Sequence, residues 1–408
     1  MNTTIPLLHD NHNHVALYGA LGSCLDVSSM QAETALDMLK GLPSDRLSVV
    51  RGWKSFELPM TTGTLSRLPP LLLINFSLHG FVISDSGLPF VEQAAPQLAK
   101  HRADQSWCEA NVPAIFAAYT VLAGINEAKL CSYIDGRVQY GIGSSDEMTV
   151  PTISAIDVCL ASSYSDRIGL WAAPALYDKL DKPRRARLSG IKLFIDGALG
   201  ARSAAICGPW IGGGEAKYTY KDDELLALLL KLGMHGTGLA VHAIGELAIE
   251  QALLAFKKAL ERGADFSLLR LEHAQFIDRK QADRAKAMGV VFSMQPNFTS
   301  DSRDYVDRLP QAYLARNNPF RMLIDEAGFV PGKDLIFGSD GMPDGIAYAA
   351  TQALFPPYPS QYLSIDELIA GYGVSKGISG TLSLNIDKHE GSVRVEASSV
   401  SNASPQIL

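Results

Sequence analysis

Residues 238–273 contain a complete strand, helix and strand pattern: Gly238-Leu-Ala-Val-His242, then the segment Gly245–Arg262, then Leu268-Leu-Arg-Leu-Glu-His273. The two outer stretches are short apolar runs that each end in a histidine. The middle segment has apolar residues at helical spacing and is followed by Gly263, a residue type that commonly ends helices. Apolar runs that alternate with such helices predict parallel β-strands joined by α-helices.

The same alternation extends outward from this segment over most of the 408-residue chain. Eight parallel strands joined by helices close into a barrel, which typically takes about 250 residues. We therefore predict the α/β class and a (β/α)8 TIM barrel. The runs predicted as its strands are Ile5–His9, Lys129–Ile134, Ile168–Ala172, Ile191–Ile195, Leu239–His242, Leu268–His273, Val290–Met294 and Leu335–Ser339.

Two further regions are predicted outside the regular alternation. A large insertion after the first strand, at about residues 20–125, contains the strand-like runs Leu47–Arg51 and Leu71–Asn75 and a helix at Val112–Leu122. Residues 376–408 alternate and are rich in serine, valine and charge, which predicts a short β-rich tail. The barrel domain is accordingly predicted at residues 1–375.

The composition excludes several classes of protein. The formal net charge is −7, the pI is about 5.7, and no run of basic residues suits a phosphate backbone, so nucleic acid is not expected as a partner. The densest apolar stretch, Leu71–Ile74, is too short to cross a bilayer, and Met1–Leu8 lacks the features of a signal peptide. Five cysteines without a CxxC pair fit reduced thiols. We expect a cytoplasmic protein without a membrane partner.

Chemically active side chains recur where the predicted strands end. His12 and His14 follow the first strand two residues apart, a spacing that turns both side chains to one face of a strand. His242, His273 and Asp340 each stand at the end of a later strand. A single such residue is more simply a satisfied polar group. Recurrence at the same end of several strands favours a site on the catalytic rim of a barrel.

Lys192 interrupts an otherwise apolar strand, Gly190-Ile-Lys-Leu-Phe-Ile-Asp196. Lysine is rarely buried without a partner, so some interaction must balance or remove its charge. The simpler interpretation is an ion pair with Asp196 or with a carboxylate across the barrel. The alternative is that Lys192 belongs to the site formed by the histidines.

At these residues the chain resembles the amidohydrolase superfamily, in particular the branch that includes N-substituted formamide deformylases and related uncharacterised metal-dependent hydrolases. The motifs that carry the resemblance are Asp10-Asn-His-Asn-His14, Lys192-Leu-Phe-Ile-Asp-Gly-Ala-Leu-Gly-Ala-Arg-Ser-Ala204, Val241-His-Ala-Ile-Gly245, Glu272-His-Ala-Gln275 and Gly338-Ser-Asp340. The stretch that begins at Lys192 is specific to the branch, whereas the HxH pair is shared by the whole superfamily.

The resemblance implies a centre of two divalent ions, with zinc expected and manganese or iron as alternatives. It implies that His12, His14 and Asp340 hold one ion, that His242 and His273 hold the other, and that Lys192 bridges both as a carbamate. A carbamate is an anion, which resolves the burial of the lysine. A bridging hydroxide would attack a carbonyl group, with Asp340 as the catalytic proton acceptor and donor.

The resemblance also suggests two substrate-binding residues and one departure. His79 and Arg202 are expected to contact the substrate, with surface or structural roles as the alternative; the histidines at positions 9, 101, 235 and 389 receive no role. Relatives carry strands before the barrel that pair with C-terminal strands in a small β-sandwich, yet here the HxH pair begins at residue 12. The tail would then be a sandwich remnant whose free edge favours a homodimer.

These inferences predict hydrolysis of an amide-type C–N bond, such as an N-acyl or N-formyl group, in a small molecule. An ester, lactone or carbamate hydrolase is the alternative, because the same attack suits each carbonyl. A one-metal deaminase would need a glutamate soon after His242, and Glu246 lies on a predicted helix. A catalytically silent barrel is the alternative outside enzymes, and bound metal separates it from the hydrolase.

Overall fold

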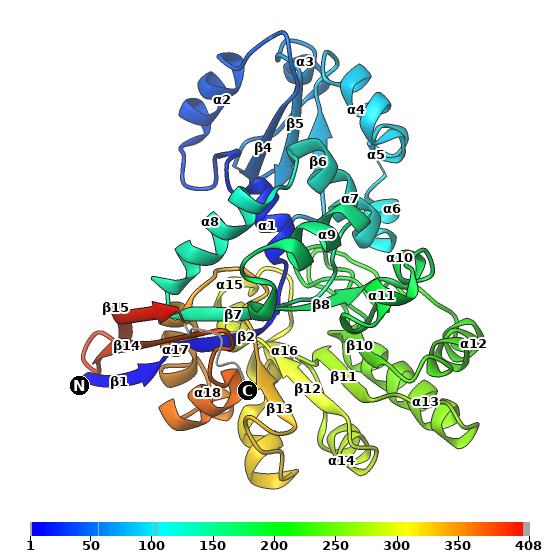
Figure 1. Cartoon of the computed structure of the whole chain (residues 1–408), viewed down its shortest axis with the longest axis vertical. Coiled ribbons are helices and arrows are strands. Elements are labelled where there is room, and N and C mark those ends of the chain that lie inside the picture. Colours follow the sequence, from blue (N-terminus) through cyan, green and yellow to red (C-terminus); the bar gives the residue numbers. More distant parts are fainter. Residues whose placement is uncertain (1, 56, 103, 403–408) are drawn as a thin grey trace. The chain divides into compact units, whose positions relative to one another are not determined.

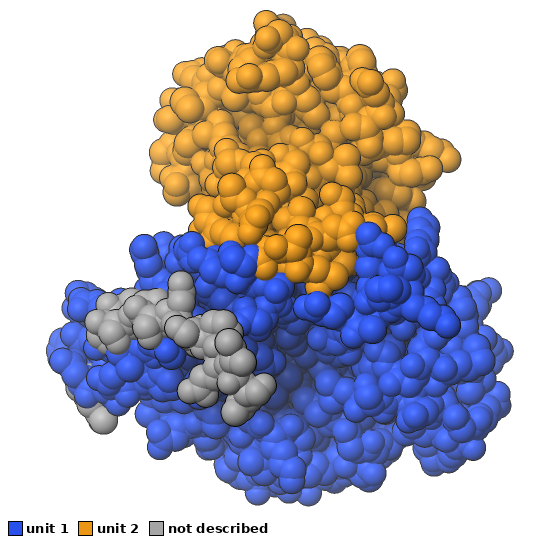
Figure 2. Space-filling view, in the orientation of Figure 1, with its two compact units in different colours: residues 1–15, 134–150, 163–408 blue, residues 16–133, 151–162 orange. Residues whose placement is uncertain are grey.

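The computed structural model describes residues 2–55, 57–102 and 104–402. The chain forms two compact units, coloured separately in Figure 2. Unit 1 comprises Met1–Val15, Ile134–Val150 and Ser163–Leu408, and unit 2 comprises Ala16–Tyr133 and Pro151–Ser162. The division into a barrel of residues 1–375 and a tail of residues 376–408 stays a prediction.

Unit 1 contains an 8-stranded parallel sheet whose strand order follows the chain (Figure 1). This order confirms the α/β class and gives a nearly closed barrel. Strands such as β10 are buried along their whole length, as the apolar runs of a parallel sheet require. The strands are β2 (Leu8–Asn13), β7 (Ile142–Glu147), β8 (Ile168–Ala172), β9 (Leu188–Phe194), β10 (Gly238–Ala243), β11 (Leu268–His273), β12 (Val291–Met294) and β13 (Leu335–Phe337).

Helical segments lie between successive strands along the chain, and α12, α13 and α14 are seen on the outside of the sheet in Figure 1. α13 buries Ile249, Leu253 and Phe256, which lie at helical spacing, and α14 starts at a capping box of Asp278 and Gln281. The helical segments are α8 (Glu127–Val138), η1 (Ser165–Arg167), α10 (Pro174–Tyr177), α11 (Lys182–Arg185), α12 (Asp222–Gly233), α13 (Glu246–Glu261), α14 (Arg279–Ala287), η2 (Pro296–Ser300), α15 (Asp301–Asp304), α16 (Gln311–Arg316), η3 (Met322–Glu326), α17 (Ile346–Leu354), η4 (Pro359–Gln361) and α18 (Ile365–Tyr372).

The predicted second strand, Lys129–Ile134, is wrong. These residues belong to α8, whose start is capped by Asn126, which accepts from the backbone N–H of Lys129 at 3.0 Å. The second barrel strand is β7, with the sequence Ile-Gly-Ser-Ser-Asp-Glu. Its polar side chains hid it from an apolar pattern. They are nevertheless buried, because tertiary partners such as Arg270 for Asp146 satisfy them.

The barrel is closed by side chains where its first and last strands meet. In the described part of the chain, β2 and β13 are the two ends of the hydrogen-bonded strand order. Asn11 bridges them by donating from Nδ2 to the carbonyl oxygen of Phe337 at 2.9 Å. The backbone N–H of Asp340 donates to the carbonyl oxygen of His12 at 2.7 Å. These bonds fix the predicted ligands of the first and last strands relative to one another.

Asp10 stabilises this seam from within. It is fully buried and accepts from the backbone N–H groups of His12 at 3.0 Å and Ser339 at 2.9 Å, and from the Ser339 hydroxyl at 2.6 Å. Arg137 of α8 forms an ion pair with the same carboxylate and with Asp344. One carboxylate therefore connects α8, the HxH segment and the turn before Asp340.

We expect Asp10→Asn to lower the free energy of unfolding by about 3 kcal/mol, because an amide group faces donors and leaves Arg137 with one charged partner fewer. Urea-induced unfolding of the full chain measures this loss. The control is Asp283→Asn, which removes an exposed ion pair with Arg279 and should cost less than about 1 kcal/mol. Equal losses in the two variants would show that Asp10 does not stabilise the seam.

A second sheet of unit 1 joins the two ends of the described chain. Its strands are β1 (Asn2–Pro6), β14 (Ile378–Asp387) and β15 (Ser392–Asn402), in the antiparallel order β1-β14-β15. The predicted run Ile5–His9 is thus divided between β1 and the barrel strand β2. Residues 2–6 supply the N-terminal strand whose absence was expected, so β14 pairs within its own chain.

Unit 2 is built on a sheet with the order β3-β4-β5-β6. Its core contains Leu39, Val50, Leu71 and Leu73. Among the described residues, no single helix is long and apolar enough to cross a membrane; the pair α7 and α8, bent by 110°, passes by length and composition alone. The remaining elements are α1 (Val15–Leu21), β3 (Leu25–Asp26), α2 (Ala32–Lys40), β4 (Ser48–Trp53), α3 (Thr62–Leu65), β5 (Leu71–Asn75), β6 (Phe81–Ile83), α4 (Leu88–Ala94), α5 (Pro96–Lys100), α6 (Gln105–Ala110), α7 (Val112–Ala123) and α9 (Ile153–Ala161).

Candidate metal centre

The structure brings the six predicted ligands together in unit 1. They come from β2 and the residue that follows it, from β9, β10 and β11, and from the turn after β13. Asp340 is partly buried and the other five are buried: Lys192 is 0% exposed, His12 1% and His273 2%. The grouping arises because parallel strands present their carboxyl ends on one face of the barrel.

One half of the centre consists of His12, His14 and Asp340. One possible ligand atom from each side chain lies within 4.8 Å of those of the other two. Nε2 of His14 is 3.2 Å from Oδ1 of Asp340, and Nε2 of His12 is 3.7 Å from the same oxygen. Two imidazole nitrogens and a carboxylate oxygen at these separations suit a divalent transition-metal ion.

The other half of the centre contains His242 and His273 and lies directly beside the first half. The ring of His273 lies 4.9 Å from the ring of His12, and the ring of His242 lies 4.5 Å from His273, measured between centroids. Nε2 of His242 is 3.4 Å from a carboxylate oxygen of Asp196. The four histidines therefore form one continuous group across the barrel mouth.

Lys192 has the environment expected of a modified or neutral amine. Its Nζ is buried, has no hydrogen-bond partner among the described residues, and lies 5.3 Å from the centroid of the Phe194 ring. Burial lowers the pKa of Lys192 to about 8, against the opposing charges of Glu272 and Asp340. A buried ammonium without a partner is costly, so the environment favours a change in its charge.

Of the two simpler interpretations of Lys192, the ion pair with Asp196 is wrong. Asp196 instead accepts hydrogen bonds from the backbone N–H groups of Ala205 at 3.0 Å, Ile244 at 3.1 Å and Gly245 at 2.9 Å. Burial raises the pKa of Asp196 to about 7, although these bonds oppose the shift. Asp196 connects the loop after β9 to the loop after β10. The motif that begins at Lys192 includes Asp196, but the sequence did not predict that Asp196 connects these two loops.

Charges within the centre shift the ionisation of its members. Burial alone would raise the pKa of Asp340, but His12 and His14 outweigh it and hold that pKa far below its usual range. Burial opposes protonation of His14, yet Asp340 and Glu147 raise its pKa to about 9. Burial lowers the pKa of His273 to about 3. Asp340 is therefore a carboxylate and His273 a neutral imidazole, both of which are metal ligands, whereas His14 carries a proton that a bound cation would replace.

Two of the six residues have unusual backbone conformations. His273 has φ 71° and Asp340 has φ 56°, in the left-handed region that residues other than glycine rarely occupy. Such conformations cost of order 1–3 kcal/mol each and persist where the surroundings enforce them. At His273 the conformation breaks the strand alternation, and both Glu272 and His273 contact His12. The strain thus places neighbouring side chains in one site.

The donor set fits the implied pair of divalent ions. Four buried imidazoles and one carboxylate are common ligands of zinc, manganese and iron. The unpartnered Nζ of Lys192 is the feature that a purely structural cluster does not explain. Conversion of this amine into a carbamate would add an anionic ligand between the two halves.

The two predicted substrate-binding residues contact other side chains in the described structure. Arg202 has φ 54°, is partly exposed and forms an ion pair with Asp307 at 3.2 Å. His79 belongs to unit 2, where its ring lies edge-on to Phe116 at 6.4 Å. Their roles toward a substrate stay predictions. His9, which received no role, is buried against Ser144 and Asp146.

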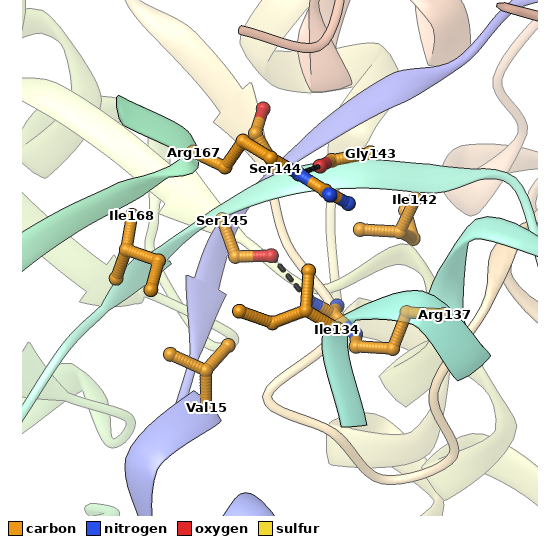
Figure 3. A pocket seen from close by; sticks show the side chains of 9 residues that line it. All are labelled: Val15, Ile134, Arg137, Ile142, Gly143, Ser144, Ser145, Arg167 and Ile168. Atoms are coloured by element: carbon orange, nitrogen blue, oxygen red, sulfur yellow. Dashed lines mark hydrogen bonds between the residues drawn. The ribbon is translucent and has the colours of Figure 1, made fainter. Parts of the chain in front are cut away.

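A separate, narrow cavity lies beside β7 (Figure 3). None of the six predicted ligands lines it. The Arg167 guanidinium donates to the carbonyl oxygen of Gly143 at 2.7 Å, and that of Arg137 donates to the hydroxyl of Ser145. The remaining lining is largely aliphatic, including Ile134. The cavity is therefore distinct from the candidate metal centre.

Two solved structures of uncharacterized metal-dependent hydrolases share this fold. The protein from Pyrococcus furiosus has a TM-score of 0.66 and 22% sequence identity, covering 91% of this chain and 81% of its own. The protein from Pyrococcus horikoshii OT3 has a TM-score of 0.66 and 21% identity, covering 91% and 80%. At these identities the likeness shows the fold alone.

Sequence comparisons point to the same group. The putative amidohydrolase YtcJ of Bacillus subtilis is 26% identical over 372 residues, which are 78% of this chain and 67% of YtcJ. The protein LONG AFTER FAR-RED 3 of Arabidopsis thaliana is 30% identical over 122 residues, 29% of this chain and 21% of that protein. Residues 148–356, about half of the sequence and including four of the six predicted ligands, match the Amidohydrolase family, and the chain belongs to this family.

Proposed function

We propose that the protein is a metal-dependent hydrolase that cleaves an amide-type C–N bond, such as an N-formyl or N-acyl group, in a small molecule. Membership of the Amidohydrolase family supports a hydrolase. The observation that carries the proposal is the buried grouping of His12, His14 and Asp340 with His242, His273 and Lys192 at one end of the barrel. The assignment of the chain to the formamide deformylase branch is part of this proposal.

The residues divide between two ion-binding positions. His12, His14 and Asp340 would hold one divalent ion, and His242 and His273 would hold the other, with Lys192 between the two sets. Zinc suits these ligands, as do manganese and iron. When bound, two such ions act as a Lewis acid toward a carbonyl group and lower the pKa of a water molecule.

Lys192 would serve as a carbamate. Its Nζ lone pair bonds to the carbon of CO₂, and the nitrogen releases a proton, so that an N-carboxylate with one negative charge replaces the amine. The buried and unpartnered Nζ supports this assignment. The lowered pKa of the lysine increases the fraction of neutral amine available for the reaction.

Asp340 would transfer the proton. Its carboxylate faces the histidines at the barrel mouth, and the bond from its backbone N–H to His12 holds it in place. As the carboxylate it accepts a proton from the attacking water, and it then donates that proton to the leaving nitrogen. This transfer makes the amine a neutral leaving group.

Two other enzyme functions differ in their support. An ester, lactone or carbamate would undergo the same carbonyl attack and is the second candidate. A deaminase has less support, because Oε1 of Glu246 accepts the Tyr313 hydroxyl at 2.5 Å and pairs with Arg316 at 3.3 Å.

We expect purified full-length protein, expressed with zinc or manganese, to contain about two metal ions per chain. Removal by a chelator should abolish hydrolysis of N-formyl, N-acyl or carbamoyl compounds, because the same residues need the ions to activate water. Elemental analysis measures the metal content, and a substrate screen measures the hydrolysis. Protein without stoichiometric metal would overturn the proposal. Metal-dependent cleavage of esters or lactones alone would instead correct the bond type.

A further inference from the structure

A buried chain of charged side chains runs through the barrel to His12. Oε2 of Glu272 lies 2.6 Å from Nδ1 of His12, and both side chains are almost completely buried. Arg270 lies on the same strand as Glu272 and donates to both of its carboxylate oxygens, from Nε at 2.8 Å and from Nη2 at 3.2 Å. A carboxylate held by a guanidinium remains an acceptor. Nδ1 of His12 is therefore the donor.

Arg270 is itself fixed by several strands. Its guanidinium donates to Asp146 of β7 at 2.8 Å, to the carbonyl oxygen of Asn11 in β2 at 2.8 Å, and to the hydroxyl of Ser293 in β12 at 3.0 Å. It also stacks over the Trp171 ring at 4.9 Å. Because these contacts hold Arg270 and Arg270 holds Glu272, the barrel core determines the position of Glu272.

The hydrogen bond from Nδ1 of His12 to Glu272 determines which ring nitrogen of His12 can bind a cation. With the proton on Nδ1, the unprotonated Nε2 is directed toward the side of Asp340, 3.7 Å away. Carboxylate partners of this kind fix the tautomer and the ring of a ligating histidine and increase its basicity. Glu272 therefore prepares His12 to bind a cation through Nε2.

The histidines of the centre have unequal partners. Nδ1 of His273 faces the amide oxygen of Gln295 at 2.7 Å, which is a neutral acceptor. Nε2 of His242 lies 3.2 Å from the carbonyl oxygen of Gly197 and 3.4 Å from a carboxylate oxygen of Asp196. Nδ1 of His14 lies 3.6 Å from Glu147. Among these contacts, the one between His12 and Glu272, at 2.6 Å, is the shortest to a carboxylate.

We infer that Glu272, held by Arg270, is a positioning residue for His12 and makes the half of the centre formed by His12, His14 and Asp340 the tighter ion-binding half. The inference rests on the proposed metal centre. It adds that the two halves bind unequally and that the cause lies in a residue outside the ligand set.

The experiment withdraws Zn²⁺ from the zinc-loaded full chain with a chromogenic chelator. Wild-type protein should release two ions in separate steps. Glu272→Gln, which keeps the shape but replaces the anionic acceptor, should lower the affinity of the tighter ion about 10- to 100-fold and that of the other ion less than about threefold. The control Asp301→Asn makes the same chemical change at a carboxylate bonded to Gln275, and should leave both affinities within about twofold.

A second measurement separates positioning from a general loss of structure. The proton on Nδ1 of His12 should give a strongly downfield ¹H signal in the zinc-loaded chain, identified by its loss in His12→Ala. Glu272→Gln should move it upfield, and Asp301→Asn should not. If Glu272→Gln does not fold, Arg270→Lys replaces it and should weaken the tighter ion about tenfold.

The outcomes separate this inference from the proposed function. Unchanged affinity of the tighter ion in a folded Glu272→Gln or Arg270→Lys chain overturns the positioning role. An equal fall in the affinities of both ions overturns the assignment to the His12 half. Wild-type protein that holds no zinc overturns the proposed metal centre itself.

Discussion

Replacing Lys192 with alanine should lower kcat/KM for the best substrate at least about 100-fold, because several kcal/mol of charge stabilisation by the ions depends on their ligands. Steady-state hydrolysis by metal-loaded protein measures the loss. Acetate or propionate should restore part of the activity by filling the vacated space with a carboxylate. Lys192→Arg should not respond, since the guanidinium brings a positive charge into the same space.

The physical reason is the charge of an unmodified lysine. An ammonium about 4 Å from a cation experiences repulsion on the order of 4 kcal/mol per unit charge at an effective dielectric of 20. Growth or incubation with ¹³C-labelled bicarbonate should therefore give a carbamate carbon signal that is absent from Lys192→Ala. Active, metal-loaded protein with an unmodified Lys192 would contradict the bridging role, while leaving a single ion at His12, His14 and Asp340.

Substitution of single histidines should remove the two ions separately. We expect His12→Ala to lose mainly one ion and His242→Ala mainly the other, because the two side chains lie in different halves of the centre. Activity should fall at least about 100-fold in each, since both ions are needed for activation of water and carbonyl. Elemental analysis after dialysis, with kinetics on the same samples, measures both effects.

Two other histidines provide the controls. His101 stacks on Trp107 with ring centroids 4.4 Å apart, and His389 is exposed in the turn between β14 and β15. Alanine at either position should leave the metal content within about 10% of wild type. Substitution of a surface side chain outside the metal centre seldom changes the structure of the protein. Loss of metal from a control, or wild-type metal in both His12→Ala and His242→Ala, would show that the ligands are assigned incorrectly.

Sequence patterns identified the barrel where the strands are apolar and regular. From β8 to β13 the predicted runs overlap the observed strands, and the residues that end them, His242 and His273, lie in the centre. The pattern failed at β7, whose Ser144, Ser145 and Asp146 are satisfied by residues distant in the chain. No local signal reveals such partners. The apolar run in α8 was therefore mistaken for the second strand.

The sequence by itself determined the barrel class and the residues that end the strands, because strand periodicity and polar strand ends are local properties. Only the tertiary structure decided which of these residues meet and what surrounds them. It separated Lys192 from Asp196, paired residues 2–6 with β14, and placed Glu272 between Arg270 and His12. These relations depend on burial and on the register of strands far apart in the chain, which no short stretch of sequence encodes.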